Sequence, residues 1–211
     1  AIAESDFQGT LKVVFQPAEE VIGGGRAIAE SGHLDDVDAL LAIHVGLDHP
    51  TGEVVAGVEG MFAVANFRTE FAGESAHAGG HPDHGANAVQ AMTTAVGNLY
   101  AIPRHADGAT RINAGDVGGG SASNVIPESA YINGEVRGGT TELKEYMRDR
   151  AETVIESAAA MYDCEARIEW GAEAPSADPD PELRRLIYEV AGDVDGVETR
   201  LERGELGGSE D

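Results

Sequence analysis

The sequence predicts an α/β protein: part of an α/β domain into which a smaller ferredoxin-like domain is inserted. Two apolar runs near the start, residues 10–16 and 39–46, have the composition of buried strands. Between residues 58 and 172, segments with the hydrophobic spacing of strands and of helices follow one another in the order β-α-β-β-α-β. That order is typical of four antiparallel strands with two helices on one face.

The first domain is predicted from its strands and their ends. Thr10 to Phe15 alternate and branch as a buried strand does, and Pro17 ends the strand because proline lacks a backbone N–H. Gly23 to Gly25 then lead into a short helix from Arg26 to Glu30. Residues 39–46 are apolar almost throughout, which indicates a strand covered on both faces, as in a parallel sheet.

The inserted domain, which we call the lid, is predicted from alternating segments and two amphipathic helices. Its strands alternate with a period of two, and its helices carry apolar residues three and four positions apart. The expected elements are strand Met61–Phe71, helix Gly85–Ala101, strands Thr110–Asp116 and Ser129–Val136, helix Glu142–Met161 and strand Glu165–Trp170.

Three segments follow from these elements. Residues 1–57 have the α/β pattern, residues 58–172 form a unit of their own, and residues 173–211 begin with a linker. A helix is expected from Glu182 to Val190, with no helix or strand after it. The glycine-rich end, residues 207–211, is what a cut through a longer protein would leave.

The charge of the chain excludes several functions. It has 38 acidic and 14 basic residues and a formal net charge of −24, so it lacks the basic surface needed to grip nucleic acid or an anionic membrane. Hydrophobic content is ordinary at 42%, which favours a folded, halophile-type protein with an acidic surface. The single cysteine, Cys164, and the absence of a signal peptide or membrane span predict a cytoplasmic protein.

The candidate catalytic residues come directly after the two predicted strands. Glu19 and Glu20 follow the first strand, and His44 lies near the end of the second. Ligands of open α/β sheets bind beyond the carboxyl ends of the strands, so these three side chains are expected on one rim. One carboxylate can bind a metal while its neighbour acts as general base. The alternatives are a solvated acidic turn for the glutamates and a core position for the histidine.

Four motifs in this order resemble a known family. They are FQPAEE, AIHVG, GESAHAGGHPDHGANAV and SASNVIPESAYINGEVRG. The chain is similar to the dinuclear-metal amidohydrolases and exopeptidases, which include aminoacylases, glutamate carboxypeptidases and indoleacetyl-amino acid hydrolases. Within that family, NLYAIPRHADGATRINAG is most similar to the branch that cleaves p-aminobenzoyl-glutamate. The fold implied is a metallopeptidase-type α/β catalytic domain with an inserted lid that also dimerises. The resemblance implies that residues 1–57 are part of the catalytic domain, that residues 58–172 are the lid, and that residues 173–211 return to the catalytic domain.

The resemblance implies a role for each matching residue. Glu19 would be the general base that activates a metal-bound water, and Glu20 and His44 would each bind one of two divalent metal ions, Mn or Zn. His77 would reach into the active site of a partner chain, where it would stabilise the oxyanion. Asn124 and Arg137 would hold the α-carboxylate of an N-acyl or N-aroyl amino acid. A turn residue at His77 and a surface ion pair at Arg137 are the alternatives.

The chain also departs from the family. The upstream His-x-Asp and Cys-Gly-His-Asp motifs and a later metal-binding histidine are absent, so we expect an incomplete set of metal ligands. A homodimer through edge-to-edge pairing of two lids is expected, with a second subunit type left open. A dipeptidase or N-acyl amino acid deacylase on the same scaffold is one alternative. A non-catalytic ferredoxin-like dimerisation or binding module is the other.

The acidic composition leads to a prediction about salt. Because salt screens repulsion among surface carboxylates, the unfolding midpoint should rise as KCl is increased into the molar range. Circular dichroism during thermal unfolding measures it, with a non-ionic osmolyte at equal osmolality as the control. A midpoint that does not rise with KCl would contradict the halophile-type interpretation.

Overall fold

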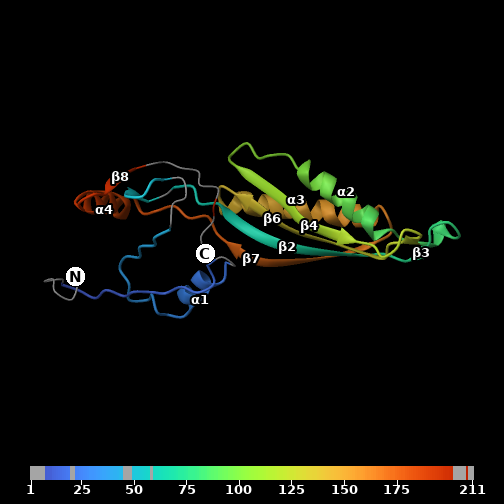
Figure 1. Ribbon diagram of the computed structural model, residues 1–211, viewed down its shortest axis with the longest axis horizontal. Helices are drawn as coiled ribbons and strands as arrows, with labels where there is room; N and C mark the ends of the chain where they lie inside the picture. Colours follow the sequence, from blue (N-terminus) through green and yellow to red (C-terminus); the bar gives the residue numbers. More distant parts are fainter. Residues whose placement is uncertain (1–7, 20–21, 45–48, 58, 202–207, 209–211) are drawn as a thin grey trace.

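The computed structural model describes residues 8–19, 22–44, 49–57, 59–201 and 208. Figure 1 shows a long lid at one end of the molecule, with the remaining elements gathered at the other. The lid confirms the predicted β-α-β-β-α-β order. Its main elements are β2 (Ala63–Ala72), α2 (Ala88–Tyr100), β4 (Thr110–Gly119), β6 (Ser129–Gly138), α3 (Thr141–Ala160) and β7 (Glu165–Ala174).

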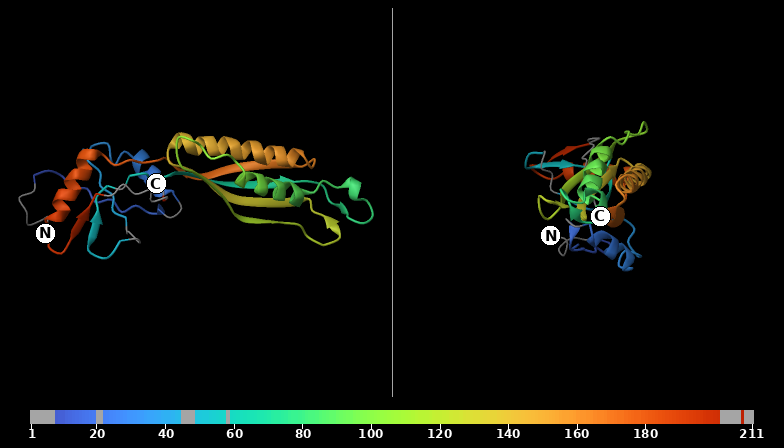
Figure 2. Two further views of the ribbon diagram at one scale, coloured as in Figure 1. Left: turned by 90° about the horizontal axis from the view of Figure 1, so that it is seen from above. Right: turned by 90° about the vertical axis from the view of Figure 1, so that its right-hand side faces the viewer.

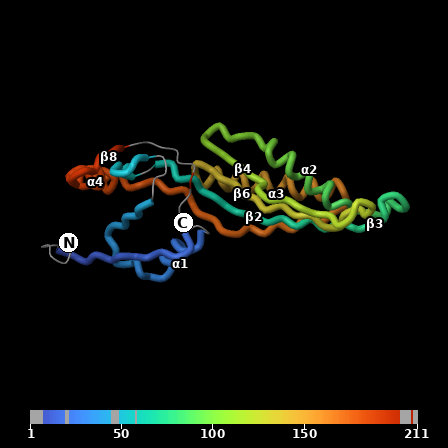
Figure 3. The backbone as a smooth tube through the Cα atoms, in the orientation of Figure 1, coloured from blue at the N-terminus to red at the C-terminus, as the bar shows by residue number. Residues whose placement is uncertain are grey.

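The lid sheet is antiparallel throughout, in the order β4-β6-β2-β7. Helices α2 and α3 cover one of its faces, and the other face is open (Figure 2). We call the end of the sheet with Gly138 and Ala174 its base, and the end with Ser129 and Glu165 its tip. Beyond the tip, β3 (Ala76–His77) pairs with β5 (Val125–Ile126) in a small sheet, and Figure 3 shows β3 at this far end of the lid. The 3-10 helix η3 (Pro82–His84) contacts β3.

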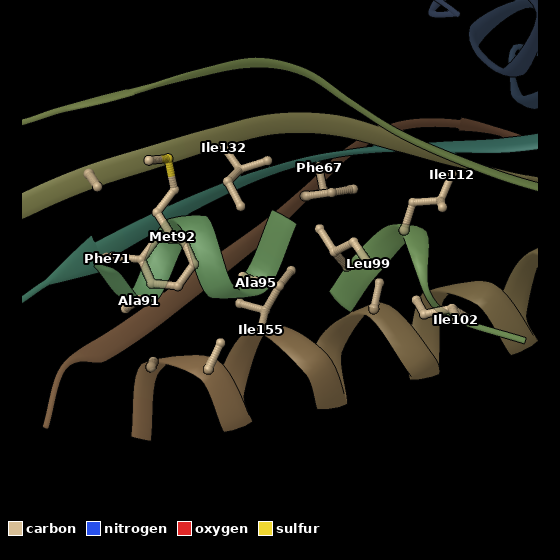
Figure 4. Close-up of a cluster of buried hydrophobic side chains, with 14 of the residues drawn as sticks. Phe67, Phe71, Ala91, Met92, Ala95, Leu99, Ile102, Ile112, Ile132 and Ile155 are labelled. Carbon is tan, nitrogen blue, oxygen red and sulfur yellow. The ribbon is translucent and has the colours of Figure 1, made fainter. Parts of the chain in front are cut away.

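The core of the lid lies between the sheet and its two helices (Figure 4). Along β2, Phe67 and Phe71 are buried, while Arg68 between them is exposed on the open face. On α3, Met147 and Ile155 are fully buried. Buried side chains thus recur every two residues in the strands and every three to four residues in the helices. These two spacings are why the sequence pattern locates the elements.

Local sequence fixes where the helices begin. The side chain of Asn87 accepts a hydrogen bond from the Gln90 N–H at the start of α2, and Thr140 caps α3 in the same way through the Leu143 N–H. Gly138 lets α3 start immediately after β6, because a Cβ there would lie 2.2 Å from the backbone nitrogen of Lys144. These caps hold both helices over the same face of the sheet.

The remaining elements are short. They are α1 (Gly24–Glu30), β1 (Glu53–Val55), α4 (Pro181–Gly192) and β8 (Glu198–Arg200). The helix expected from Arg26 and the helix expected from Glu182 are confirmed as α1 and α4. The prediction of no strand after α4 is wrong, because β8 pairs in parallel with β1. Both are three-residue strands whose pairing partners lie far apart in sequence, so neither carries a periodic signal.

The two predicted apolar strands of the first domain are not strands in this structure. Residues 10–18 and 39–44 have no ladder partner among the described residues, and Val45 and Gly46 lie outside them. Phe15 is 90% exposed and Ile43 is 99% exposed. A strand forms only where its N–H and C=O groups are paired, and no described segment forms a backbone ladder with either run.

The packing of α3 leads to a stability prediction. Replacing the fully buried Ile155 by alanine should lower the free energy of unfolding by about 2–5 kcal/mol, because the lost contacts leave a cavity between α3 and the sheet. The matched control is Glu156→Ala, at the next position on the exposed side of the helix, which should change stability by less than about 0.5 kcal/mol. Urea unfolding measures both, and equal effects would contradict the packing described here.

Candidate functional site

Glu19 lies in a tightly folded loop at the start of α1. The residue before it, Ala18, has φ of 60°, a left-handed conformation that is uncommon for a residue with a Cβ. The Ile22 N–H donates to the Glu19 carbonyl at 2.9 Å, and the Gly23 N–H donates to the Ala18 carbonyl at 3.2 Å. Gly24 packs so closely that a Cβ would lie 1.9 Å from the Pro17 carbonyl oxygen. The loop therefore holds a half-buried Glu19 in a strained turn.

The predicted metal ligands are placed only in part. His44 is exposed, and Glu20 lies outside the described residues. Among the residues that the structure describes, no group of three or more His, Cys, Asp or Glu side chains is arranged to hold a metal ion. The described donors do not by themselves make a metal site, so the ligand roles of Glu20 and His44 stay predictions.

His77 lies beyond the tip of the lid, with its ring oriented by the backbone. Its Nδ1 accepts hydrogen bonds from the Gly79 N–H at 3.2 Å and the Gly80 N–H at 2.9 Å. Because Nδ1 is an acceptor, the proton of the neutral ring is on Nε2, which remains available as a donor on an exposed side chain. The two glycines that follow Ala78 supply this turn.

Asn124 lies beside His77. The Ala78 N–H donates to the Asn124 carbonyl oxygen at 2.9 Å, and His77 pairs with Val125 in the small sheet. Two residues far apart in the sequence are thus neighbours at one end of the lid. Sequence reasoning identified both residues but gave no indication that they are adjacent.

Arg137 lies at the opposite end of the lid. It pairs with Val64 and Arg111 at the base of the sheet, eight residues along β6 from Ser129 at the tip, a distance of roughly 26 Å. Its guanidinium donates to both oxygens of Glu135, from Nε at 2.8 Å and from Nη2 at 3.0 Å. A single chain therefore does not bring Arg137 and Asn124 together.

A charged junction that the sequence did not predict joins α1 to the base of the lid. The Glu173 carboxylate lies 3.3 Å from the nearly buried Lys144 Nζ, 3.6 Å from Arg26 and 3.7 Å from Arg148. Burial on its own would raise the pKa of Glu173, but the hydrogen bond and charge of Lys144, with the two arginines, hold that pKa below its usual value. The only signal in the sequence is a lysine at a core-facing position of α3.

Beside this junction lies a cleft of about 210 Å³ between α1 and β7. Residues 22–30 form one wall and residues 171–173 form the other. On β2, Val64 pairs with Ala174 of β7 on one side and with Arg137 of β6 on the other. Arg137 therefore lies at the same height along the sheet as the end of β7 that lines the cleft. The structure thus brings the α1 loop that follows Glu19 to the base of the lid, where Arg137 lies.

Comparison with known proteins gives one match for the lid and further matches over nearly the whole chain. Residues 60–163 match the M20 peptidase dimerisation domain. Over 99% of its length the chain is 39% identical to a p-aminobenzoyl-glutamate hydrolase subunit of Escherichia coli, and it covers 48% of that protein. It is 41% identical to an indole-3-acetyl-aspartic acid hydrolase of Enterobacter agglomerans over 92% of its length, covering 45% of that protein. The chain spans about half the length of these relatives.

The similar solved structures are of the same kinds of protein as the relatives found by sequence. An aminobenzoyl-glutamate utilization protein from Klebsiella pneumoniae superposes with a TM-score of 0.83 and 40% identity, over 93% of this chain and 50% of that one. A dinuclear metal-binding M20 peptidase from Bacillus subtilis superposes with a TM-score of 0.68 and 25% identity, over 93% and 49% of the two chains. Within the described residues, no helix is long and apolar enough to span a membrane.

Proposed function

Residues 60–163 of this chain belong to the dimerisation domain of the M20 peptidases, and from that premise we propose that the complete gene product is a metal-dependent amidohydrolase. Its substrate would be an N-acyl or N-aroyl amino acid of the p-aminobenzoyl-glutamate type. One observation carries this proposal: the similarity to the E. coli hydrolase extends over 99% of the chain, through the Glu19 segment as well as the lid. A dimerisation module alone would match only in the lid.

The reaction needs a base, and Glu19 fits that role. It is half-buried in a strained turn whose backbone hydrogen bonds fix its position, next to the cleft at the base of the lid. A carboxylate held in this way can take a proton from the attacking water and return it to the departing nitrogen. Strained backbone is common next to catalytic residues, and the left-handed conformation of Ala18, directly before Glu19, supports this assignment.

Two divalent metal ions, Mn or Zn, would supply Lewis acidity to the water and the amide carbonyl. Carboxylate and imidazole donors suit either metal, and we assign Glu20 and His44 one ligand position each. A relative in the family is described as a dinuclear metal-binding peptidase. The remaining ligands would have to come from outside the described residues.

His77 would stabilise the oxyanion that forms at the amide carbonyl. Its Nε2–H is the free donor because Nδ1 is held by the Gly79 and Gly80 N–H groups, so the ring needs no tautomer change to donate. With Asn124 beside it, His77 lies at the far end of the lid from Arg137. We therefore propose that His77 and Asn124 act in the site of a second copy of the chain, whose own Arg137 binds the α-carboxylate.

The amino acid part of the substrate is proposed to be acidic. Two relatives at 39% and 41% identity are named for amides of glutamate and of aspartic acid. A deacylase of a neutral amino acid is the second candidate, because an N-acetyl-L-cysteine deacetylase of Bacillus subtilis is 28% identical over 89% of the chain. The E. coli relative is described as one subunit of its enzyme, so the mass of the assembly, measured below, also tests for a second subunit type.

The homodimer is proposed to form through β4 and α2. Helix α2 has no charged residue in its 13 positions, although a quarter of the chain is charged, and Thr93 and Tyr100 on it are exposed. The other free edge, β7, exposes alternating charges at Glu165, Arg167 and Glu169, which is how proteins protect an edge from pairing. The edge that is flanked by the uncharged helix α2 is therefore the one suited to a second copy.

Antiparallel pairing of two β4 edges also explains the separation of the site residues. Tyr100, at the end of α2, contacts Asn113 and the Ala114 N–H, so α2 covers the half of β4 nearer the tip. The two-fold axis that relates the two copies would then pass through that half of β4, near Val117. Val117 is about seven residues from Thr110 at the base of the sheet, a distance of roughly 23 Å along the strand. The partner strand runs the opposite way, so the partner's tip extends about equally far towards this chain's base.

Removal of the proposed base is the test of activity. In the complete gene product, Glu19→Gln should lower kcat on p-aminobenzoyl-glutamate by roughly 10²–10⁴-fold, because general base catalysis contributes that much. Metal content by plasma mass spectrometry, measured after dialysis in high salt, should not change. Retained turnover would remove Glu19 from the base role, and a loss of metal would make it a ligand instead. Failure of the unaltered protein to hydrolyse N-acyl amino acids would contradict the proposed function itself.

The dimer surface has a separate test. Thr93→Glu places a charge on the exposed face of α2 without harming the helix, so it should convert the dimer to a monomer, whereas Thr93→Ala should remain dimeric. Light scattering after size exclusion measures the mass. A dimer that survives Thr93→Glu but dissociates with Arg167→Glu would move the interface to β7. A monomeric unaltered protein at micromolar concentration would contradict the homodimer.

A further inference from the structure

A second arginine, Arg111, lies directly opposite Arg137. The two residues are paired in the register of β4 and β6, so their side chains project from the same face of the sheet. Thr110 and Ile112, on either side of Arg111, are 1% and 7% exposed and face the helices, which places Arg111 on the open face. Two arginine side chains therefore leave neighbouring strands side by side at the base of the lid.

Such a pair is unfavourable for stability. Like charges directly opposite each other on neighbouring strands repel and destabilise the sheet. The chain has 14 basic residues against 38 acidic ones, so two arginines facing one another are not a result of abundant positive charge. Glu135 compensates the charge of Arg137, so Arg111 is the member of the pair whose charge calls for a negatively charged ligand.

The contacts of Arg111 position it without neutralising it. Its Nη1 donates to the Thr110 carbonyl oxygen at 3.0 Å, and its Cζ lies 5.7 Å from the centre of the Phe62 ring. Within the described part of the chain, Arg111 forms no ion pair with a carboxylate. Arg137 differs, because Glu135 holds its guanidinium with two hydrogen bonds.

We propose that Arg111 binds the side-chain carboxylate of an acidic amino acid while Arg137 binds its α-carboxylate. This inference rests on the proposed function. Neighbouring strands lie roughly 4.8 Å apart, a separation that the short aliphatic chain of a glutamyl or aspartyl group can bridge. The Arg111 guanidinium can form two parallel hydrogen bonds to a carboxylate. The substrate class is thus N-acylated dicarboxylic amino acids, and Arg111 selects them over neutral ones.

The position along the sheet agrees with this role. Arg137 pairs with Val64, which also pairs with Ala174, and residues 171–173 line the cleft next to α1. Both arginines are thus level with the cleft that borders the Glu19 loop. A substrate with its two carboxylates on β6 and β4 would direct its amide across β2 towards β7 and that cleft, over the open face of the sheet.

The experiment compares an acidic and a neutral substrate. In the complete gene product, Arg111→Gln should lower kcat/KM for p-aminobenzoyl-glutamate by roughly 10-fold to 100-fold, since a charged hydrogen bond is lost. The value for p-aminobenzoyl-alanine should change by less than about twofold, since that compound has no second carboxylate to bind. Arg167→Gln is the matched control: an exposed arginine on the same sheet, 2.8 Å from Glu169, whose removal should leave both values unchanged.

A binding measurement makes the test independent of turnover. By calorimetry on protein freed of metal with EDTA, N-acetyl-glutamate should bind more tightly than N-acetyl-alanine, and Arg111→Gln should abolish the difference. An equal loss on both substrates, or an unchanged preference, would overturn the role of Arg111, provided that the urea midpoint of the variant is unchanged. If the unaltered protein hydrolyses neither substrate but keeps the preference in binding, the proposed function fails while the carboxylate site stands.

Discussion

The ladder between β2 and β6 is the interaction on which the positions of all the candidate lid residues depend. It runs without interruption from Ala63 opposite Gly138 to Ala72 opposite Ser129. Because successive side chains of a strand alternate between faces, a shift by one residue would bury Arg137 under the helices and expose Val136. The buried face of β2, with Phe67 and Phe71 against α2 and α3, prevents that shift. Hydrophobic packing on one face thus sets the chemistry of the other.

The same ladder separates the site residues. It places Arg137 at the base and continues beyond Ser129 into the small sheet that carries His77 and Asn124. The two ends lie roughly 26 Å apart along β6, so no rearrangement of side chains within one lid can bring them together. A site that needs both ends must therefore use two chains, which links the catalytic proposal to the dimerisation domain that the family match identifies.

The accuracy of the sequence predictions varies along the chain for physical reasons. The lid was predicted because its strands and helices are long enough to show their periods of two and of three to four in the local sequence. Residues 10–16 and 39–44 have the composition of strands, yet composition does not supply a ladder partner, and none lies among the described residues. Strands β1 and β8 were missed for the opposite reason: they have partners but only three residues each. Among the candidate site residues, Glu19, His77, Asn124 and Arg137 could all be named from local motifs. Arg111 is recognisable only from the register of β4 on β6, because nothing in TRINAG distinguishes it from a surface arginine.

The arginine pair also has to be reconciled with a formal net charge of −24. At low ionic strength that charge would repel a substrate with two carboxylates before it reached the lid. In molar salt the Debye length falls to about 3 Å, so distant surface carboxylates are screened while a guanidinium in contact with its ligand is not. The proposed recognition of an acidic substrate by this acidic protein thus depends on cations at contact distance. Under the halophile-type interpretation, that recognition is expected to be strongest in concentrated salt.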